Sequence, residues 1–176
     1  TTYLVTANEG DAREWGNYVE LSRARALCPT GNPASANCQI SASWAGWNNC
    51  ALPPCYGTTA PNGVLADANL GRLNVTSVTG RNGAGKFDEL YALGGRSFSV
   101  WSTDGDLVFD SGGQMEQIVH DFIPGFENAN QTSPGAAKDE RSDDKGPEPE
   151  GLAMGKVWGR NYAFIGLERI GGVMVF

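Results

Sequence analysis

The sequence predicts an all-β fold, specifically a partial β-propeller of short antiparallel sheets that carries a disulfide-stapled loop insertion. Twenty-four glycines and nine prolines interrupt the apolar runs of this 176-residue chain, which supplies turns at the short intervals that many brief strands need. The apolar runs themselves alternate in strand fashion. All four cysteines fall in a single polar stretch. These observations favour a sheet with one stapled insertion over a helical fold.

In the first half of the chain, three segments have the pattern of strands. Residues 2–6 are β-rich and largely apolar, and residues 7–11 then end the strand with residues that favour turns. Residues 18–21 alternate, and residues 73–78 resume the alternation after the insertion. The insertion, residues 28–63, is therefore expected to decorate a sheet.

The insertion contains Cys28, Cys38, Cys50 and Cys55. Four cysteines allow three pairings; the sequential pairing closes the shortest loops, but the sequence does not choose among them. A zinc site of four thiolates is a rival, although there is no Cys-x-x-Cys pair. Because Trp44 and Trp47 lie in this loop, where limited burial is expected, we interpret the loop as a possible assembly contact with a partner. Trp101 and Trp158 are expected in the core.

The second half of the chain begins with the clearest hairpin. Residues 97–101 alternate strictly, Asp104 and Gly105 supply a turn, and residues 107–109 return. Residues 127–150 are polar, charged and rich in Pro and Gly, which predicts a long loop. Strands are expected again over residues 161–167 and 173–176.

Three similar apolar runs open at Tyr3, Tyr91 and Tyr162, a weak internal repeat whose spacing suits about three propeller blades. Propellers usually close with four to eight blades, since an open array leaves strand edges unpaired. We therefore interpret residues 1–176 as a single domain that is a fragment of a larger propeller. The alternative is that a partner chain supplies the remaining blades.

Charge and modification signals indicate an extracellular protein. A formal net charge of −7 repels phosphate backbones, so nucleic acid is an unexpected partner, whereas divalent cations are plausible ones. No apolar run approaches the roughly 20 residues needed to span a bilayer. Sequons at Asn74 and Asn130 predict N-glycosylation and agree with the disulfide interpretation. The chain is expected to be secreted or on the cell surface.

Four blocks in order resemble the choice-of-anchor I domain family, and together they span nearly the whole chain outside the insertion. The blocks are residues 3–14, 87–101, 143–151 and 166–173. The resemblance implies a secreted or surface-anchored β-propeller. It also implies relatives among mesenchyme-specific cell-surface glycoproteins and alkaline-phosphatase-like proteins. The chain departs from the family pattern in its cysteine insertion and in its shorter length.

Acidic side chains gather in two segments, at the end of the first strand and in the loop before a later strand. Carboxylates and backbone carbonyls are the ligands that calcium prefers, and flanking prolines would stiffen the loop. The candidate ligands are Glu9, Asp11, Asp143, Asp144, Glu148 and Glu150. The rival interpretation is a solvated face, or ion pairs with Arg13, Arg141 and Lys145.

The leading functional hypothesis is a calcium-binding structural protein of a surface or matrix. The alternative is a metal-dependent phosphatase, for which Arg13, Arg96 and Arg169 could neutralise developing charge. Each of these arginines is also an ordinary ion-pair partner. The only histidine, His120, precedes Asp121, but no serine or cysteine motif accompanies it, which favours a structural or exposed histidine. The sequence does not assign any catalytic residue.

Overall fold

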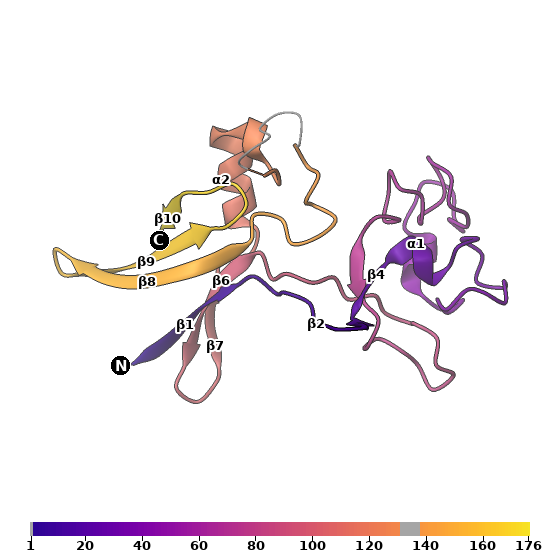
Figure 1. Ribbon diagram of the computed structural model, residues 1–176, viewed down its shortest axis with the longest axis horizontal. Coiled ribbons are helices and arrows are strands. Elements are labelled where there is room, and N and C mark those ends of the chain that lie inside the picture. Colours follow the sequence, from indigo (N-terminus) through magenta and orange to yellow (C-terminus); the bar gives the residue numbers. More distant parts are fainter. Residues whose placement is uncertain (1, 131–137) are drawn as a thin grey trace. The chain divides into compact units, whose positions relative to one another are not determined.

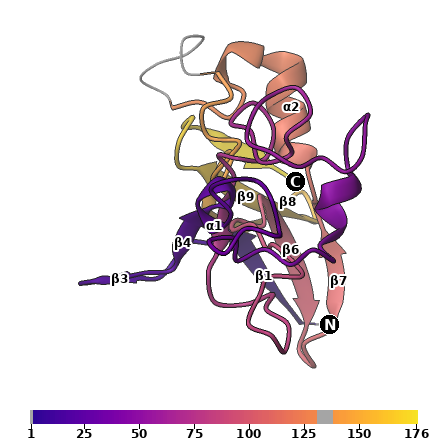
Figure 2. The same ribbon diagram turned by 90° about the vertical axis from the view of Figure 1, so that its right-hand side faces the viewer.

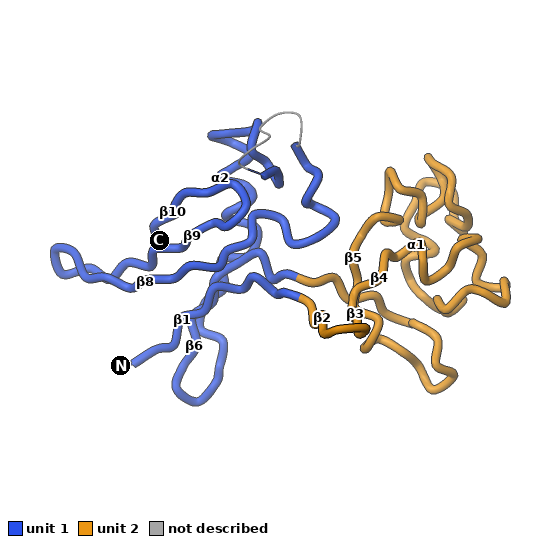
Figure 3. The backbone as a smooth tube through the Cα atoms, in the orientation of Figure 1, with its two compact units in different colours: residues 1–11, 94–176 blue, residues 12–93 orange. Residues whose placement is uncertain are grey.

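The computed structural model describes residues 2–130 and 138–176. The chain divides into two compact units, which Figure 3 colours separately. Unit 1 consists of Thr1–Asp11 and Gly94–Phe176, and unit 2 consists of Ala12–Leu93. Unit 1 is therefore assembled from both ends of the sequence, and the chain leaves it once to build unit 2.

One sheet of unit 1 joins the first strand to the predicted hairpin (Figure 1). Strands β1 (Tyr3–Asn8), β6 (Ser97–Ser102) and β7 (Leu107–Asp110) are antiparallel in the order β1-β6-β7. Tyr3 pairs with Ser102, and Asn8 pairs with Ser97. The predicted first strand and the predicted hairpin are thus confirmed.

The second sheet of unit 1 has the order β10-β9-β8, also antiparallel. Its strands are β8 (Pro149–Val157), β9 (Arg160–Leu167) and β10 (Val173–Val175). Strands β9 and β10 confirm the two expected at the end of the chain. Strand β8 was not predicted, and the expected loop of residues 127–150 therefore ends before Glu150. Glycines at two positions of β8 and its lack of strict alternation hide the strand pattern.

One helix, which the sequence analysis did not predict, packs against the strands of unit 1. Helix α2 (Gln114–Phe122) comes shortly after β7, and a short 3-10 helix, η2 (Pro124–Phe126), follows it (Figure 2). Met115 and Val119 of α2 are buried at a spacing of four residues, which places both on one helical face. The strand-rich fold of small antiparallel sheets is confirmed, and α2 is an element that the sequence analysis did not predict.

The core of unit 1 lies between α2 and the strands. Alternate residues of β9 point inward, because successive side chains of a strand face opposite sides. The buried members of this core are Phe98, Met115, Val119, Ala163, Ile165, Leu167 and Ile170. Packing of β6, β9 and α2 thus fixes the base from which the loops of unit 1 extend.

Unit 2 has two small antiparallel sheets. One is the hairpin of β2 (Glu14–Trp15) and β3 (Tyr18–Val19), and the other pairs β4 (Leu21–Arg23) with β5 (Asn74–Thr76). Helix α1 (Ala24–Leu27) and the 3-10 helix η1 (Ala45–Asn48) complete its regular elements. The strands expected near residues 18–21 and 73–78 are present.

The cysteine-bearing insertion contributes half of the buried residues in the core of unit 2, so it is more than an exposed decoration. Disulfides join Cys28 to Cys38 and Cys50 to Cys55, which is the sequential pairing. Because all four sulfurs form disulfides, the rival zinc site is wrong. Trp44 and Trp47 are buried, so the expectation of limited burial for these two residues is also wrong. The two rings pack edge to face, at a centroid distance of 5.1 Å.

The predicted repeat is only partly reflected in strands. The runs at Tyr3 and Tyr162 lie in β1 and β9, but Ala92 in the run that opens at Tyr91 makes only an isolated bridge to Val75. Within the described residues, none of the four sheets closes on itself. None of the described helices is long and apolar enough to cross a membrane.

Candidate functional site

The side chain of Glu148 lies at the centre of the principal ionic cluster of unit 1. It is fully buried, between the buried prolines Pro147 and Pro149, the second of which begins β8. Its φ is +51°, a backbone conformation that side-chain-bearing residues seldom adopt. The surroundings must therefore offset two costs, that of burying the charge of the carboxylate and that of the backbone strain.

Three basic side chains provide that compensation. Arg141 Nη2 donates to Glu148 Oε1, and Arg169 Nε lies 2.9 Å from Glu148 Oε2. Lys145 Nζ lies 3.3 Å from the same Oε2 atom. A buried carboxylate with several charge-assisted partners is stable in place, whereas removal of its charge would leave the buried basic groups uncompensated.

Lys145 extends the cluster to the end of β1. Its Nζ atom lies 2.6 Å from Glu9 Oε1 and 3.0 Å from Asp11 Oδ1. The segment from Glu9 to Asp11 is positioned by Gly10, whose φ is +71°. A Cβ atom at Gly10 would lie 2.4 Å from the backbone nitrogen of Gly94, so only glycine fits there.

The cluster also reaches the end of β9. Arg169 Nη2 lies 3.4 Å from Glu168 Oε1, and Arg141 Nη2 lies 3.2 Å from Asp144 Oδ2. Carboxylate oxygens of Glu9, Glu148 and Glu168 lie within 4.8 Å of one another. Three segments that are distant in sequence therefore bring acidic oxygens together. We use the name Glu148 cluster for the eight charged residues of this group. They are the acidic residues Glu9, Asp11, Asp144, Glu148 and Glu168 and the basic residues Arg141, Lys145 and Arg169.

The acidic groups of the Glu148 cluster differ in proton affinity. Burial works to raise the pKa of Glu148, but hydrogen bonds with Arg169, Glu168 and Arg141 lower this pKa to about 2. The hydrogen bond with Glu148 and burial both raise the pKa of Glu168. Burial would lower the pKa of Lys145, yet its hydrogen bonds to Glu9 and Asp11 raise it. Glu168 thus takes up a proton before Glu148 as the pH falls.

Acid is expected to weaken unit 1 through Glu148. The pKa of this group falls from 4.5 to about 2 on folding, so its stabilisation is complete above pH 4.5 and is lost as the pH falls toward 2. The shift corresponds to about 3 kcal/mol of unfolding free energy. Urea unfolding between pH 6 and pH 2 measures it. Glu148→Gln should abolish this part of the pH dependence, and an unchanged acid profile in that variant would contradict the assignment.

A further arginine fastens the loop that carries Lys145. Arg96 Nη1 lies 2.8 Å from Glu116 Oε1 on α2. Arg96 Nη2 donates to the carbonyl oxygens of Ser142 and Asp144, at 2.6 and 3.0 Å. Arg96 and Arg169, both considered as phosphate-binding groups, are therefore engaged in ion pairs. The third such candidate, Arg13, pairs with Glu20 in unit 2 at 2.8 Å.

The structure gathers four of the six predicted metal ligands, namely Glu9, Asp11, Asp144 and Glu148, into the Glu148 cluster. Glu150 is exposed on β8 instead of lying in a loop, and Asp143 is half-buried beside Asp144. The anticipated ion pairs of Arg141 and Lys145 are also present. Glu168 was not among the predicted ligands. Its place directly after an apolar strand, as for Glu9, was the only signal available.

The predicted glycosylation sites remain predictions. Asn74 is partly buried in β5 of unit 2. Asn130 is described, but the remainder of its sequon lies outside the described residues.

His120 takes part in a surface ion pair. Its Nδ1 atom lies 3.0 Å from Glu127 Oε2, and Lys138 Nζ lies 3.1 Å from the same oxygen. Hydrogen bonds with His120 and then Lys138 lower the pKa of Glu127. An exposed imidazole held in this way agrees with the structural or exposed role expected for His120.

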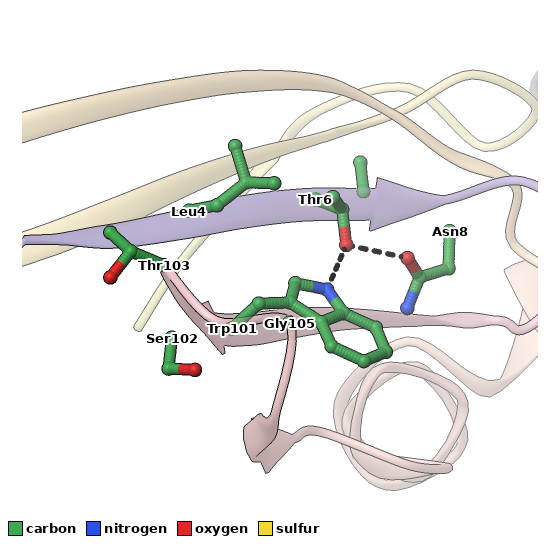
Figure 4. A pocket seen from close by; sticks show the side chains of 8 residues that line it. Leu4, Thr6, Asn8, Trp101, Ser102, Thr103 and Gly105 are labelled. Carbon is green, nitrogen blue, oxygen red and sulfur yellow. Dashed lines mark hydrogen bonds between the residues drawn. The ribbon is translucent and has the colours of Figure 1, made fainter.

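A shallow groove on the β1–β6 sheet has neutral chemistry. Trp101, half-buried rather than fully buried as expected, donates from Nε1 to Thr6 Oγ1 at 3.0 Å, and Thr6 donates to Asn8 Oδ1 at 2.9 Å (Figure 4). The hydrogen bonds fix the indole against the strand. Leu4, which is exposed, forms the other wall of the groove. Among the described residues that line the groove, none is ionisable.

Comparison with known proteins places these features in a family. The choice-of-anchor I domain matches residues 1–176. Gigasin-3a of Magallana gigas is 38% identical over 62% of this chain and 40% of its own length. The mesenchyme-specific cell surface glycoprotein of Strongylocentrotus purpuratus is 29% identical over 99% of this chain and 23% of its own length. The chain thus spans less than half of either relative. No solved structure matches it.

Proposed function

Since the chain belongs to the choice-of-anchor I domain family, we propose that it is a structural module of a surface or matrix assembly. Two disulfides and a cell-surface glycoprotein relative fit a secreted or cell-surface protein, because disulfides persist in oxidising compartments. The arginines suited to phosphate chemistry are already held in ion pairs. These observations favour a structural role over a phosphatase.

The proposal includes calcium in the Glu148 cluster. The observation that supports it is the close approach of Glu9, Glu148 and Glu168, whose carboxylate oxygens lie within 4.8 Å. Two carboxylates as close as Glu148 and Glu168 repel each other unless a proton or a cation lies between them. The raised pKa of Glu168 means that protonation of this carboxylate relieves the repulsion. A calcium ion, which binds carboxylate oxygens in flexible geometry, would relieve the same repulsion.

Lys145 is the internal competitor for this position. Its ammonium group lies 2.6 Å from Glu9 Oε1 and 3.3 Å from Glu148 Oε2. Calcium would occupy the same region and move the Lys145 side chain toward Asp11, which is exposed. Binding would therefore exchange one cation for another without rebuilding the loops.

Calcium is expected to raise the melting temperature of the full protein at neutral pH, because a ligand that binds only the folded state stabilises it. The gain should shrink in mild acid, since Glu168 takes up a proton as the pH falls through its raised pKa. Differential scanning fluorimetry with calcium and with a chelator measures the effect. Glu168→Gln should remove most of the shift, whereas Glu140→Gln, at an exposed position, should retain it.

The same samples distinguish a structural ion from a catalytic one. Hydrolysis of a phosphate monoester should be absent with calcium and with chelator alike. Turnover that the chelator abolishes would contradict the structural proposal and favour the metal-dependent phosphatase. Equal melting temperatures under all conditions would contradict the calcium site.

The propeller is likewise part of the proposal. The face of the β10-β9-β8 sheet opposite the buried residues of β9 carries apolar side chains that stay exposed among the described residues. Val157, Val173 and Val175 are 40%, 63% and 55% exposed. A sheet with two apolar faces is typical of one packed between other sheets. Further blades, from the longer protein or from a partner chain, would bury this face.

Assembly through the cysteine-rich loop also belongs to the proposal. Since Trp44 and Trp47 are buried, the contact would use exposed apolar residues of the loop instead. Leu52 lies within the Cys50–Cys55 disulfide loop and is 70% exposed, and Tyr56 follows that loop and is 44% exposed. These two side chains are the natural anchors for a protein partner.

A further inference from the structure

The turn between β8 and β9 has an unusual residue at its tip. Val157 pairs with Arg160, so Trp158 and Gly159 form a two-residue hairpin turn. Their φ values are +49° and +84°. A turn with both central residues at positive φ normally carries Asn-Gly or Gly-Gly, because other side chains are strained there.

Neither local conformation nor core packing accounts for Trp158. The expected core position is wrong, since its side chain is 98% exposed. A tryptophan here therefore has the backbone strain of a left-handed residue and gains no burial in return. Strained residues that the fold does not require are candidates for function.

The charge around this turn is opposite to that of the protein. Between Gly151 and Leu167 the sequence contains Lys156 and Arg160 and no acidic residue, whereas the whole chain has a net charge of −7. Both basic side chains are exposed, and among the described residues no carboxylate forms an ion pair with either. The tip is thus a cationic point on an acidic molecule.

The hairpin register places the two charges on either side of the indole. Lys156 is opposite Asn161, and Arg160 is opposite Val157. Because successive residues of a strand point to opposite faces, Lys156 and Arg160 lie on opposite faces of the hairpin. An elongated anionic ligand that crosses the tip could contact both charges and the ring.

We propose that the β8–β9 hairpin tip, defined as Lys156, Trp158 and Arg160, binds an acidic polysaccharide. The flat indole stacks on a sugar ring, and the two cations pair with sulfate or carboxylate groups of neighbouring sugars. A membrane surface fits less well, because a single aromatic ring followed by glycine offers little area for insertion. This inference rests on the extracellular role proposed above but is independent of the calcium site.

Replacement of Trp158 by asparagine separates binding from folding. Trp158→Asn supplies the residue that this turn prefers, so the melting temperature should stay the same or rise. Binding of the full protein to immobilised heparin, used as the probe, should weaken about tenfold or more. Lys156→Gln with Arg160→Gln should weaken it similarly and reduce its dependence on salt. Trp15→Asn provides the control, because Trp15 is also exposed and lies in a hairpin, at the strand position next to the turn, but follows Glu14.

Four results would overturn the proposal. The first is that Trp158→Asn binds heparin as tightly as the parent, and the second is that the parent binds uncharged dextran as tightly as heparin. The third is that the parent binds phosphatidylserine vesicles as tightly as heparin, in a way that depends on Trp158. The fourth is that Trp158→Asn has a lower oligomeric mass than the parent. The last two would identify a membrane or a second copy as the partner. Repeating the heparin titration with a chelator separates this test from the calcium test, since heparin binding should be unchanged there.

Discussion

Glu148→Gln should destabilise unit 1 by about 3 to 5 kcal/mol at neutral pH, which is the typical cost of breaking a buried ion pair from one side. Glutamine preserves the volume of the side chain and its backbone conformation, so the effect isolates the charge. The loss leaves Arg141, Lys145 and Arg169 close together without the carboxylate that they share. Urea unfolding followed by circular dichroism measures the change.

The matched control for Glu148→Gln is Glu140→Gln, because Glu140 is exposed and lies in the same loop. Its unfolding free energy should change by less than about 0.5 kcal/mol. If the two variants were equally stable, Glu148 would not be the centre of the cluster. A double variant with Lys145→Met should recover part of the loss, since it removes the repulsion between Lys145 and the two arginines that no longer share a carboxylate with it.

Trp47→Ala should destabilise unit 2 by about 3 to 5 kcal/mol, the usual effect of deleting a large buried aromatic side chain. Trp47 is 2% exposed, packs edge-on against Trp44 and Tyr56, and donates from Nε1 to the carbonyl oxygen of Ser41 at 2.8 Å. Thermal unfolding with the disulfides intact would measure the effect as a lower melting temperature.

Trp15→Ala is the comparison for Trp47→Ala, since Trp15 is 68% exposed and belongs to the same unit. Its effect on stability should be within about 0.5 kcal/mol. A small effect of Trp47→Ala, together with loss of a partner interaction, would instead support an assembly contact of the cysteine loop that uses Trp47 itself.

Local patterns predicted the parts of the fold that depend on neighbouring residues. The alternation from Ser97 to Trp101 and the turn at Asp104–Gly105 identify β6 and β7 without any tertiary information. Strand β8 was not predicted because Gly151 and Gly155 interrupt its pattern of apolar residues. Gly151 and Gly166 face each other across the β8–β9 pair, which is a tertiary reason for glycine that a single sequence does not display.

Helix α2 and the burial of tryptophan were missed for related reasons. Only Met115 and Val119 of α2 are buried, so its apolar stripe is too narrow to stand out among short apolar runs. Trp47, for which limited burial was expected, is buried, and Trp158, which was expected in the core, is exposed. Their burial depends on how disulfide loops and hairpins close in space, and hydrophobicity alone does not encode that.

For the candidate site, residue type was a better guide than position. Carboxylates at strand ends indicated Glu9, Asp11 and Glu148, which the structure brings together. Glu168 became part of the cluster only through the pairing of β8 with β9, a contact between segments that the sequence does not show to be adjacent. The ion pair of Arg169 with Glu148 depends on the same pairing, whereas Arg96 pairs with Glu116 on α2.

The central claim, that Glu9, Glu148 and Glu168 form a calcium site for which Lys145 substitutes, is tested most directly by a crystal structure of the full protein grown with calcium. The account predicts an ion coordinated by these three carboxylates, at 2.3 to 2.6 Å from their oxygens, with the Lys145 ammonium displaced toward Asp11. A structure at millimolar calcium in which Lys145 Nζ still lies between Glu9 and Glu148, with no ion beside Glu168, would contradict it.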